Sequence, residues 1–269
     1  MSGLRGRWAV GKLKIARVVE MELRRGNRWI LPAATYEAVK AVKWLAPHFA
    51  TPEGRLILSI HMFVLDTPGG ARIAVDTCVG NDKTGRGIPN WNKLQGPLLE
   101  DLEKAGYPLD SFTHVICTHL HVDHVGFNTR LVNGKWVPTF PNAKYLFVRR
   151  EYEFWKQQVA ENPSEGAIMN DSVFPVVEAG VVTFVEPDAV IVDEGLDCKI
   201  SLMPTHGHTP GHASILMTSQ GQDAMITGDW IHHPIQMSRL DICAVTADSD
   251  VVAARNTRIK VLDSLADSN

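Results

Sequence analysis

One short stretch of the chain concentrates four residues that can bind a metal ion. The run HLHVDH places His119, His121, Asp123 and His124 within six residues, directly after an apolar segment (residues 113–118) that is predicted to be a β-strand. Because alternate side chains of an extended segment point the same way, His119 and His121 are expected to converge on one ion. Asp123 and His124 follow as the chain turns, and can serve a second ion beside it. Imidazole and carboxylate ligands suit zinc, and also iron, manganese or cobalt.

The elements that must position this run form a repeated pattern of strands and helices. In the first half, two β-rich segments (55–66 and 71–76) are joined by the turn TPGG, and a helix is predicted at 97–105, between Pro97 and Gly106. The second half repeats the pattern, with short strands at 181–185, 199–203, 213–218 and 223–227 and an amphipathic helix at 249–265. We therefore predict a single domain, residues 1–269, built from two similar αβ halves. Residues 23–50, with their aromatic side chains, are interpreted as an N-terminal elaboration of it.

Composition excludes several classes of partner. The 269 residues carry 27 Lys and Arg against 30 Asp and Glu, a formal net charge of −3, and so lack the positive charge that nucleic-acid binding requires. The four cysteines form no CxxC pair, which argues against a thiolate zinc site and a disulfide framework and fits a reducing compartment. No apolar run approaches the roughly 18 residues of a membrane span, and no secretory leader is apparent. We expect a cytoplasmic protein whose partner is a small molecule, with neither nucleic acid nor membrane involved.

Four motifs, in order along the chain, resemble those of the metallo-β-lactamase superfamily. The run THLHVDH is similar to the superfamily's signature, and upstream of it IAVDT (73–77) resembles the segment that contains its strand-end aspartate. Downstream, THGHTPGH (205–212) resembles the superfamily's TPGHTPGH segment, and ITGD (226–229) resembles the strand that ends in a bridging aspartate. The fold implied by this resemblance is of the α+β class, a four-layer αβ/βα sandwich with the metals at one edge of the sheets.

The resemblance also implies a role for each candidate residue. It assigns the first ion to His119, His121 and His208, the second ion to Asp123 and His124, and the bridge between them to Asp229. Two divalent ions, zinc first, would then hold a bridging hydroxide that attacks the substrate, with Asp123 and Asp229 as the catalytic residues. Metal binding lowers the pKa of water from 15.7 towards about 7, which makes such a nucleophile available at neutral pH. Asp76 would support the metal loop, and His212 would orient a ligand through a hydrogen bond.

Within the superfamily, the nearest resemblance is to the acyl-homoserine lactonases and the methyl-parathion-hydrolase-like enzymes. It rests on the HGHTPGH segment and on the HHP continuation at 232–234. It implies hydrolysis of a lactone, ester or phosphotriester bond in a small hydrophobic substrate. Three alternatives remain open: a glyoxalase-II-like thioesterase, a single-iron persulfide dioxygenase, and a non-catalytic metal-binding relative. A homodimer is also left open.

The C-terminal end departs from the superfamily's pattern. Relatives continue from the last helix into one more strand, whose histidine completes the second metal site. This sequence ends at Asn269 and has no histidine beyond His233. The last strand of the sandwich is therefore missing from this sequence. Either the sequence is shorter than the natural protein, which we favour, or the second ion has one protein ligand fewer, unless His232 or His233 takes the vacant position.

Overall fold

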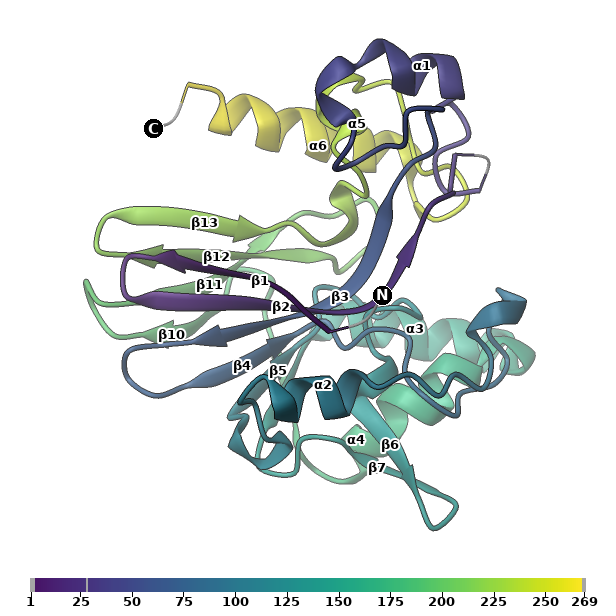
Figure 1. The fold of residues 1–269 in the computed structure, drawn as a ribbon. Helices are drawn as coiled ribbons and strands as arrows, with labels where there is room; N and C mark the ends of the chain where they lie inside the picture. The colour runs from purple at the N-terminus through teal and green to yellow at the C-terminus, as the bar shows by residue number, and fades with distance from the viewer. Residues whose placement is uncertain (1–2, 28, 268–269) are drawn as a thin grey trace.

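The computed structural model describes residues 3–27 and 29–267, and its two main sheets lie face to face between layers of helices (Figure 1). The larger sheet has the strand order β1 (Gly3–Val10), β2 (Leu13–Leu23), β3 (Leu58–Asp66), β4 (Arg72–Val75), β5 (His114–Ile116), β8 (Lys144–Val148) and β9 (Val182–Val185). Its first four strands pair antiparallel, and β4, β5, β8 and β9 pair parallel. The sheet is therefore mixed.

The second sheet is wholly antiparallel. It runs in chain order through β10 (Val190–Asp193), β11 (Lys199–Pro204), β12 (Ala213–Ser219) and β13 (Gln222–Ile226). A separate hairpin joins β6 (Thr129–Val132) to β7 (Lys135–Pro138). The helices are α1 (Tyr36–Ala41), α2 (Leu98–Lys104), α3 (Arg149–Glu161), α4 (Phe174–Glu178), α5 (Ile235–Ser238) and α6 (Val251–Leu265).

Alternation of apolar side chains along the strands creates two buried layers. In β3, Met62 and Val64 are buried on the face towards the helices, whereas Leu65 is buried on the face towards the second sheet. From the second sheet, Ile200 and Ile215 fill the same space between the sheets. Successive side chains of a strand point to opposite faces, so one strand contributes to both layers. Each fully buried side chain of this kind contributes roughly 1.5–3 kcal/mol.

Helices close the two outer faces and complete the four-layer sandwich that the sequence predicts. Apolar side chains of α2, α3 and α4 pack on the larger sheet, and Figure 1 shows these helices on one side of the molecule. On the opposite side, Val261 of α6 packs with Trp230 against Met203 and Met225 of the smaller sheet. The α+β fold class is therefore confirmed. No helix among the described residues is long and apolar enough to cross a membrane.

The N-terminal elaboration, residues 23–50, packs against the segment that follows the smaller sheet. Leu31 and Leu45 share a buried cluster with Ile235 and Ile242, and α1 lies beside α5 in Figure 1. The amide nitrogens of Trp29, Ile30 and Leu31 approach the carbonyl oxygen of Gly26. This contact brings chain segments about 200 residues apart to the same end of the sandwich.

The structure differs from the sequence prediction at two places near the histidine run. The predicted strand 113–118 is wrong in extent, because β5 ends at Ile116 and the amide of Thr118 donates to the side chain of Asp76 (2.8 Å) in place of a strand neighbour. The helix predicted to begin at residue 249 begins instead at Val251, where the carboxylate of Asp250 caps it by accepting from the amide of Ala253.

Candidate metal centre

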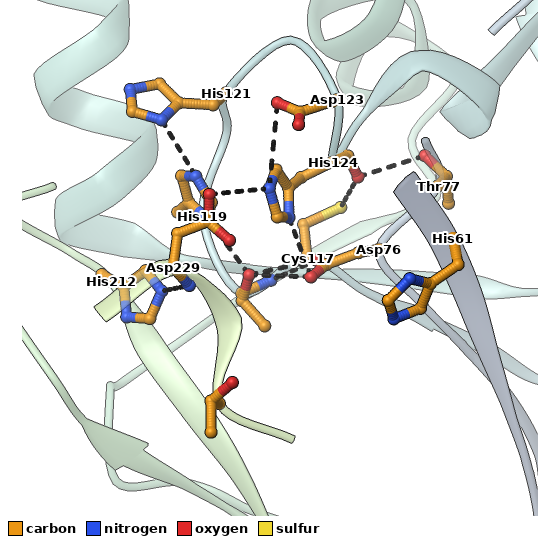
Figure 2. A network of polar contacts seen from close by, with 12 residues as sticks. His61, Asp76, Thr77, Cys117, His119, His121, Asp123, His124, His212 and Asp229 are labelled. Carbon is orange, nitrogen blue, oxygen red and sulfur yellow. Dashed lines mark hydrogen bonds and ion pairs between the residues drawn. The ribbon is translucent and has the colours of Figure 1, made fainter. Parts of the chain in front are cut away.

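Three loops meet at one edge of the two sheets and carry all six predicted ligands. The first follows β5 and contains residues 119–124, the second follows β11 and contains His208, and the third follows β13 and contains Asp229. Figure 2 shows His119, His121, His124 and Asp229 turned towards a common centre. Five of the six predicted ligands fall within groups whose donor atoms could hold a metal ion, and the sixth, Asp123, lies beside His124.

The first group of donors is a triangle of imidazole nitrogens. The distances are 3.0 Å from His119 Nε2 to His121 Nδ1, 2.8 Å from His121 Nδ1 to His208 Nε2, and 3.1 Å from His208 Nε2 to His119 Nε2. Three ligands of a tetrahedral zinc ion, each about 2.0–2.1 Å from the metal, lie roughly 3.3 Å apart. Burial lowers the pKa of His119 and of His121 well below the usual range, so these imidazoles are neutral and have a lone pair to give. The triangle fits a single divalent ion.

The second group gathers around the carboxylate of Asp229. One of its oxygens, Oδ2, lies 3.4 Å from His124 Nε2 and 3.8 Å from His208 Nε2. The carboxylate of Asp123 is 3.9 Å from His124 Nε2. Burial raises the pKa of Asp123, whereas the field of His124 and His232 outweighs burial at Asp229 and holds its pKa well below the usual range. Asp229 therefore lies between the two groups as a charged oxygen donor.

Asp76 supports the first loop, as the resemblance implies. Its Oδ2 lies 2.9 Å from His124 Nδ1, and its other oxygen accepts from the Thr118 amide. Asp76 has a φ of 54°, a left-handed conformation that an aspartate adopts more readily than most residues. The carboxylate of Asp76 therefore fixes both the start of the loop and the ring orientation of His124.

Two further side chains orient ligands on the other loops. The ring of His212 accepts from the amide of Asp229 through Nε2 (2.9 Å) and contacts Thr205 Oγ1 through Nδ1 (2.8 Å), which is the supporting role expected of it. Asp248 Oδ1 lies 2.9 Å from His208 Nδ1, and both side chains are fully buried. Sequence reasoning missed Asp248, because no pattern distinguishes it from Asp250 two residues later.

A cavity of about 880 Å³ opens onto the donor groups. Its polar end is formed by the candidate ligands, and its remaining wall is largely apolar, with Trp29 and Ile30 from the N-terminal elaboration facing Met237 and Val245. The Trp29 ring meets Trp91 edge to face, with 5.9 Å between ring centroids. Residues 23–50 therefore form part of the wall beside the donor groups, which is more than the packing role that the sequence favoured for each aromatic residue.

Two neighbouring histidines of the HHP segment have different environments. His233 is tied into the fold, because its Nε2 contacts the Phe49 carbonyl oxygen (2.7 Å) and its Nδ1 accepts from the Ile235 amide (3.1 Å). His232 lines the cavity with Nε2 3.3 Å from Asp229 Oδ2, and neither of its ring nitrogens has a hydrogen-bond partner. Burial lowers the pKa of His232 to about 4. The sequence alone did not indicate which of His232 and His233 would face the cavity.

His61 lies in β3, as predicted, and apart from the donor groups in Figure 2. Its Nδ1 contacts the hydroxyl and the carbonyl oxygen of Ser59 (3.0 and 3.1 Å). Burial, followed by the charge of Arg17, lowers the pKa of His61 to about 4. Because the side chain also lines the cavity, it is a neutral wall residue as well as a sheet residue.

The fold and the donor groups together define a metal-binding αβ/βα sandwich protein. Residues 58–267 match the family model described as "Metallo-beta-lactamase superfamily", and the chain belongs to this superfamily. Among curated proteins, it is 28% identical over 191 residues to an N-acyl homoserine lactonase of Bacillus thuringiensis, covering 66% of each chain. It is 27% identical over 176 residues to the N-acyl homoserine lactonase AttM of Rhizobium radiobacter, covering 60% of each. The match thus spans just under two thirds of these relatives' length.

Solved structures resemble this fold over nearly the whole chain. The hydrolase AbOPH, titled as a member of the β-lactamase superfamily, superposes with a TM-score of 0.74 at 22% identity, covering 99% of this chain and 87% of that one. AidC, titled a dizinc quorum-quenching lactonase, superposes with a TM-score of 0.71 at 20% identity and the same coverage. At this level of identity the likeness concerns the fold.

Proposed function

We propose that this chain is a dinuclear metal-dependent hydrolase that cleaves a lactone, with ester and phosphotriester bonds as further substrates of the same site. The observation that carries the proposal is the position of Asp229. Its Oδ2 lies within 3.8 Å of nitrogen donors from both groups, His124 on one side and His208 on the other. A single carboxylate oxygen between two donor groups suits two neighbouring ions better than one.

The ligand assignment combines the observed groups with the resemblance to the superfamily. His119, His121 and His208 would hold the first ion, as their nitrogen triangle supports. By resemblance, Asp123 and His124 would hold the second ion and Asp229 would contact both, and His232 lies in a third group with His208 and Asp229. Zinc is the first choice for a set of imidazoles and carboxylates, with iron, manganese or cobalt as alternatives. Bound divalent ions would lower the pKa of water to supply a nucleophile and would polarise the substrate oxygen.

The protein's own residues would position the substrate. His232 reaches the cavity with neither ring nitrogen hydrogen-bonded, although Nε2 lies 3.3 Å from Asp229 Oδ2, and a buried polar group without a hydrogen bond costs free energy. A substrate oxygen that accepts from this imidazole would remove that cost. The apolar wall around Trp29 and Met237 would exclude water from the rest of a hydrophobic substrate.

The lining of the cavity offers no cationic side chain to an anionic substrate. Among the described residues that line it there is no Lys or Arg. A glyoxalase-II-like thioesterase needs cationic side chains to hold the carboxylates of a glutathione ester, so the lining favours a neutral substrate over a glutathione ester. The names of the curated relatives, N-acyl homoserine lactonases, support the choice of a neutral lactone.

Metal analysis combined with a substrate panel tests the proposal. Protein loaded with zinc or cobalt should contain close to two ions per chain and should release acid fastest from hydrophobic lactones. Nitrocefin, a β-lactam that carries a carboxylate, and glutathione thioesters should be slower. One ion per chain together with oxygen consumption would favour the persulfide dioxygenase alternative, and two ions without turnover on the panel would favour a non-catalytic relative.

A further inference from the structure

One buried carboxylate joins the ligand loops of the two halves of the molecule. Glu151 lies in the first turn of α3 and is 1% exposed. Its Oε1 accepts from the amide of Leu120 (3.1 Å), between His119 and His121, and its Oε2 accepts from the amide of Gly211 (2.9 Å), next to His212. The loop after β5 and the loop after β11 are therefore held by the two oxygens of the same side chain.

The third donor to this carboxylate connects it to a ligand. The indole Nε1 of Trp155, one helical turn along α3, donates to Glu151 Oε1 (2.7 Å). The Trp155 ring in turn meets the ring of His121 edge to face, with 5.2 Å between ring centroids. Glu151 thus fixes a ring that packs directly on one of the three nitrogen donors.

The close approach of the second loop depends on a glycine. A Cβ atom added to Gly211 would lie 2.4 Å from the amide nitrogen of Glu151 and 2.5 Å from its Cβ. Distances this short cannot be relieved by turning a flexible side chain, because they involve the helix backbone. Gly211 and Glu151 are therefore a matched pair: the glycine allows the loop to reach α3, and the carboxylate holds it there.

From these contacts we infer that Glu151 is a positioning residue that sets the separation between the first-half ligands His119 and His121 and the second-half ligand His208. This inference rests on the metal-ligand assignment of the proposed function and not on its substrate. A carboxylate with three N–H donors and no exposure is costly to disturb, since each lost partner leaves a buried donor unsatisfied. Because the first donor triangle is built from both loops, a small shift of one loop changes all the distances that involve His208.

Substitution with retention of shape tests the inference. Glu151→Gln keeps the side-chain volume but directs an NH₂ group at one of the backbone amides. Glu153→Gln on the exposed face of the same helix is the matched control. The readout is the chelator concentration that removes half of the bound zinc. We expect Glu151→Gln to lose zinc at a chelator concentration at least about tenfold lower than the wild type or the control, as residues that orient metal ligands typically do.

The cobalt form gives a second readout that a purely structural role would not move. A change in the separation of the nitrogen donors should alter the visible absorption of bound cobalt in Glu151→Gln. The control Glu153→Gln should keep the wild-type cobalt spectrum.

If Glu151→Gln does not fold, Trp155→Phe is the second variant. It removes one of the three donors to Glu151 and keeps an aromatic ring beside His121, and it should show the same loss of zinc affinity to a smaller extent. Unchanged zinc retention and cobalt spectrum in the folded variant, whatever its thermal stability, would overturn the inference. These readouts do not depend on turnover, so absence of activity towards lactones would overturn the proposed function and leave this inference standing.

Discussion

At the level of single residues, the candidate site combines buried imidazoles of lowered pKa with one pair of opposite charges. Burial lowers the pKa of His119, His121 and His212, so each is an acceptor or a ligand near neutral pH. His124 and Asp229 differ, because their mutual attraction outweighs burial: the surrounding carboxylates raise the pKa of His124, and His124 lowers the pKa of Asp229. A divalent cation would replace the proton on His124, since a ligand histidine must be deprotonated.

Removal of Asp229 tests this division of roles. Asp229→Ala and His208→Ala should each reduce catalytic efficiency by about a thousandfold or more, equivalent to roughly 4 kcal/mol of transition-state stabilisation. Both variants should keep the wild-type circular dichroism spectrum, because the two side chains belong to the loops and not to the core between the sheets. Asp263→Ala on the exposed face of α6 is the control. Wild-type turnover with wild-type metal content in either variant would falsify the ligand assignment.

Asp248, which contacts the ligand His208, leads to a second prediction for a single residue. Its carboxylate lies 2.9 Å from His208 Nδ1, and both side chains are fully buried. Asp248→Asn should reduce metal affinity by about 10- to 100-fold, as loss of a carboxylate behind a ligand histidine generally does. The measurement is zinc binding in competition with a chromophoric chelator. An exposed aspartate, Asp223, changed to Asn gives the matched comparison, and equal affinities in the two variants would remove Asp248 from the site.

At the level of secondary structure, the sequence predicted the elements that have a strong period and missed those that depend on distant contacts. The hairpin of β3 and β4 and helix α2 were predicted, because alternating or helically spaced apolar residues are bounded by Pro and Gly. The β1–β2 hairpin was not predicted, because Arg and Lys interrupt its apolar pattern. Its turn contains Gly11, which has a φ of 52°. Helix α3 was also missed, since its one fully buried side chain is Glu151, whose two backbone partners lie 31 and 60 residues away.

A buried cationic cluster holds the segment after β4 against β6 and the helical turn Met169–Val173. Lys83 Nζ, with a fully buried side chain, donates to the Thr129 hydroxyl and to the Asp171 carbonyl oxygen, and Arg86 pairs with the Asp171 carboxylate (2.9 Å). Burial lowers the pKa of Lys83 from 10.5 to about 7. The unfolded chain therefore binds more protons than the folded one between pH 7 and pH 10.5, and this residue's contribution to the free energy of unfolding increases as the pH rises.

The resulting prediction compares Lys83→Met with the wild type at two pH values. Between pH 7 and pH 9, the free energy of unfolding of the wild type should increase by about 2 kcal/mol relative to that of the variant. Urea unfolding of the metal-free proteins measures this difference without interference from bound ions. Lys135→Met, at the exposed first residue of β7, should follow the wild-type pH dependence. A constant difference between wild type and Lys83→Met would mean that Lys83 keeps its ordinary pKa.

The N-terminal elaboration gives another prediction at this scale. Trp29 lines the cavity, and its carbonyl oxygen accepts from the hydroxyl of Thr246 on the facing wall (2.8 Å). Trp29→Ala should raise KM for a lactone with a long acyl chain by about tenfold, equal to roughly 1.4 kcal/mol of lost contact, with little effect on a short-chain lactone. Trp44→Ala is the control, because Trp44 is similarly exposed but is not among the residues that line the cavity. Equal changes for both chain lengths would contradict a role in holding the acyl chain.

At the level of the whole molecule, the candidate site lies where the two halves of the sandwich meet. The first half supplies the histidine run and Asp76, and the second half supplies His208, Asp229 and Asp248. The order and spacing of the motifs therefore allowed most of the site to be predicted from sequence, because each ligand follows a strand whose end lies at the same edge. Asp248 and Glu151 could not be predicted in this way, since each acts through a neighbour that is distant along the chain.

This arrangement makes bound ions into cross-links between the halves, so metal should stabilise the whole fold. A ligand that binds only the native state at 100 times its dissociation constant stabilises that state by about 2.7 kcal/mol. We expect removal of metal by a chelator to lower the melting temperature by several degrees, since about 1 kcal/mol corresponds to roughly 2–4 °C for a domain of this size, and re-addition of zinc should restore it. The double variant His208→Ala, Asp229→Ala separates cross-linking from simple binding, because it keeps the ligands of the first half and removes both ligands of the second. In that variant zinc should raise the melting temperature much less than in the wild type, as followed by circular dichroism at matched free zinc. If zinc stabilises the double variant and the wild type equally, the ions act within the first half alone and do not hold the two halves together.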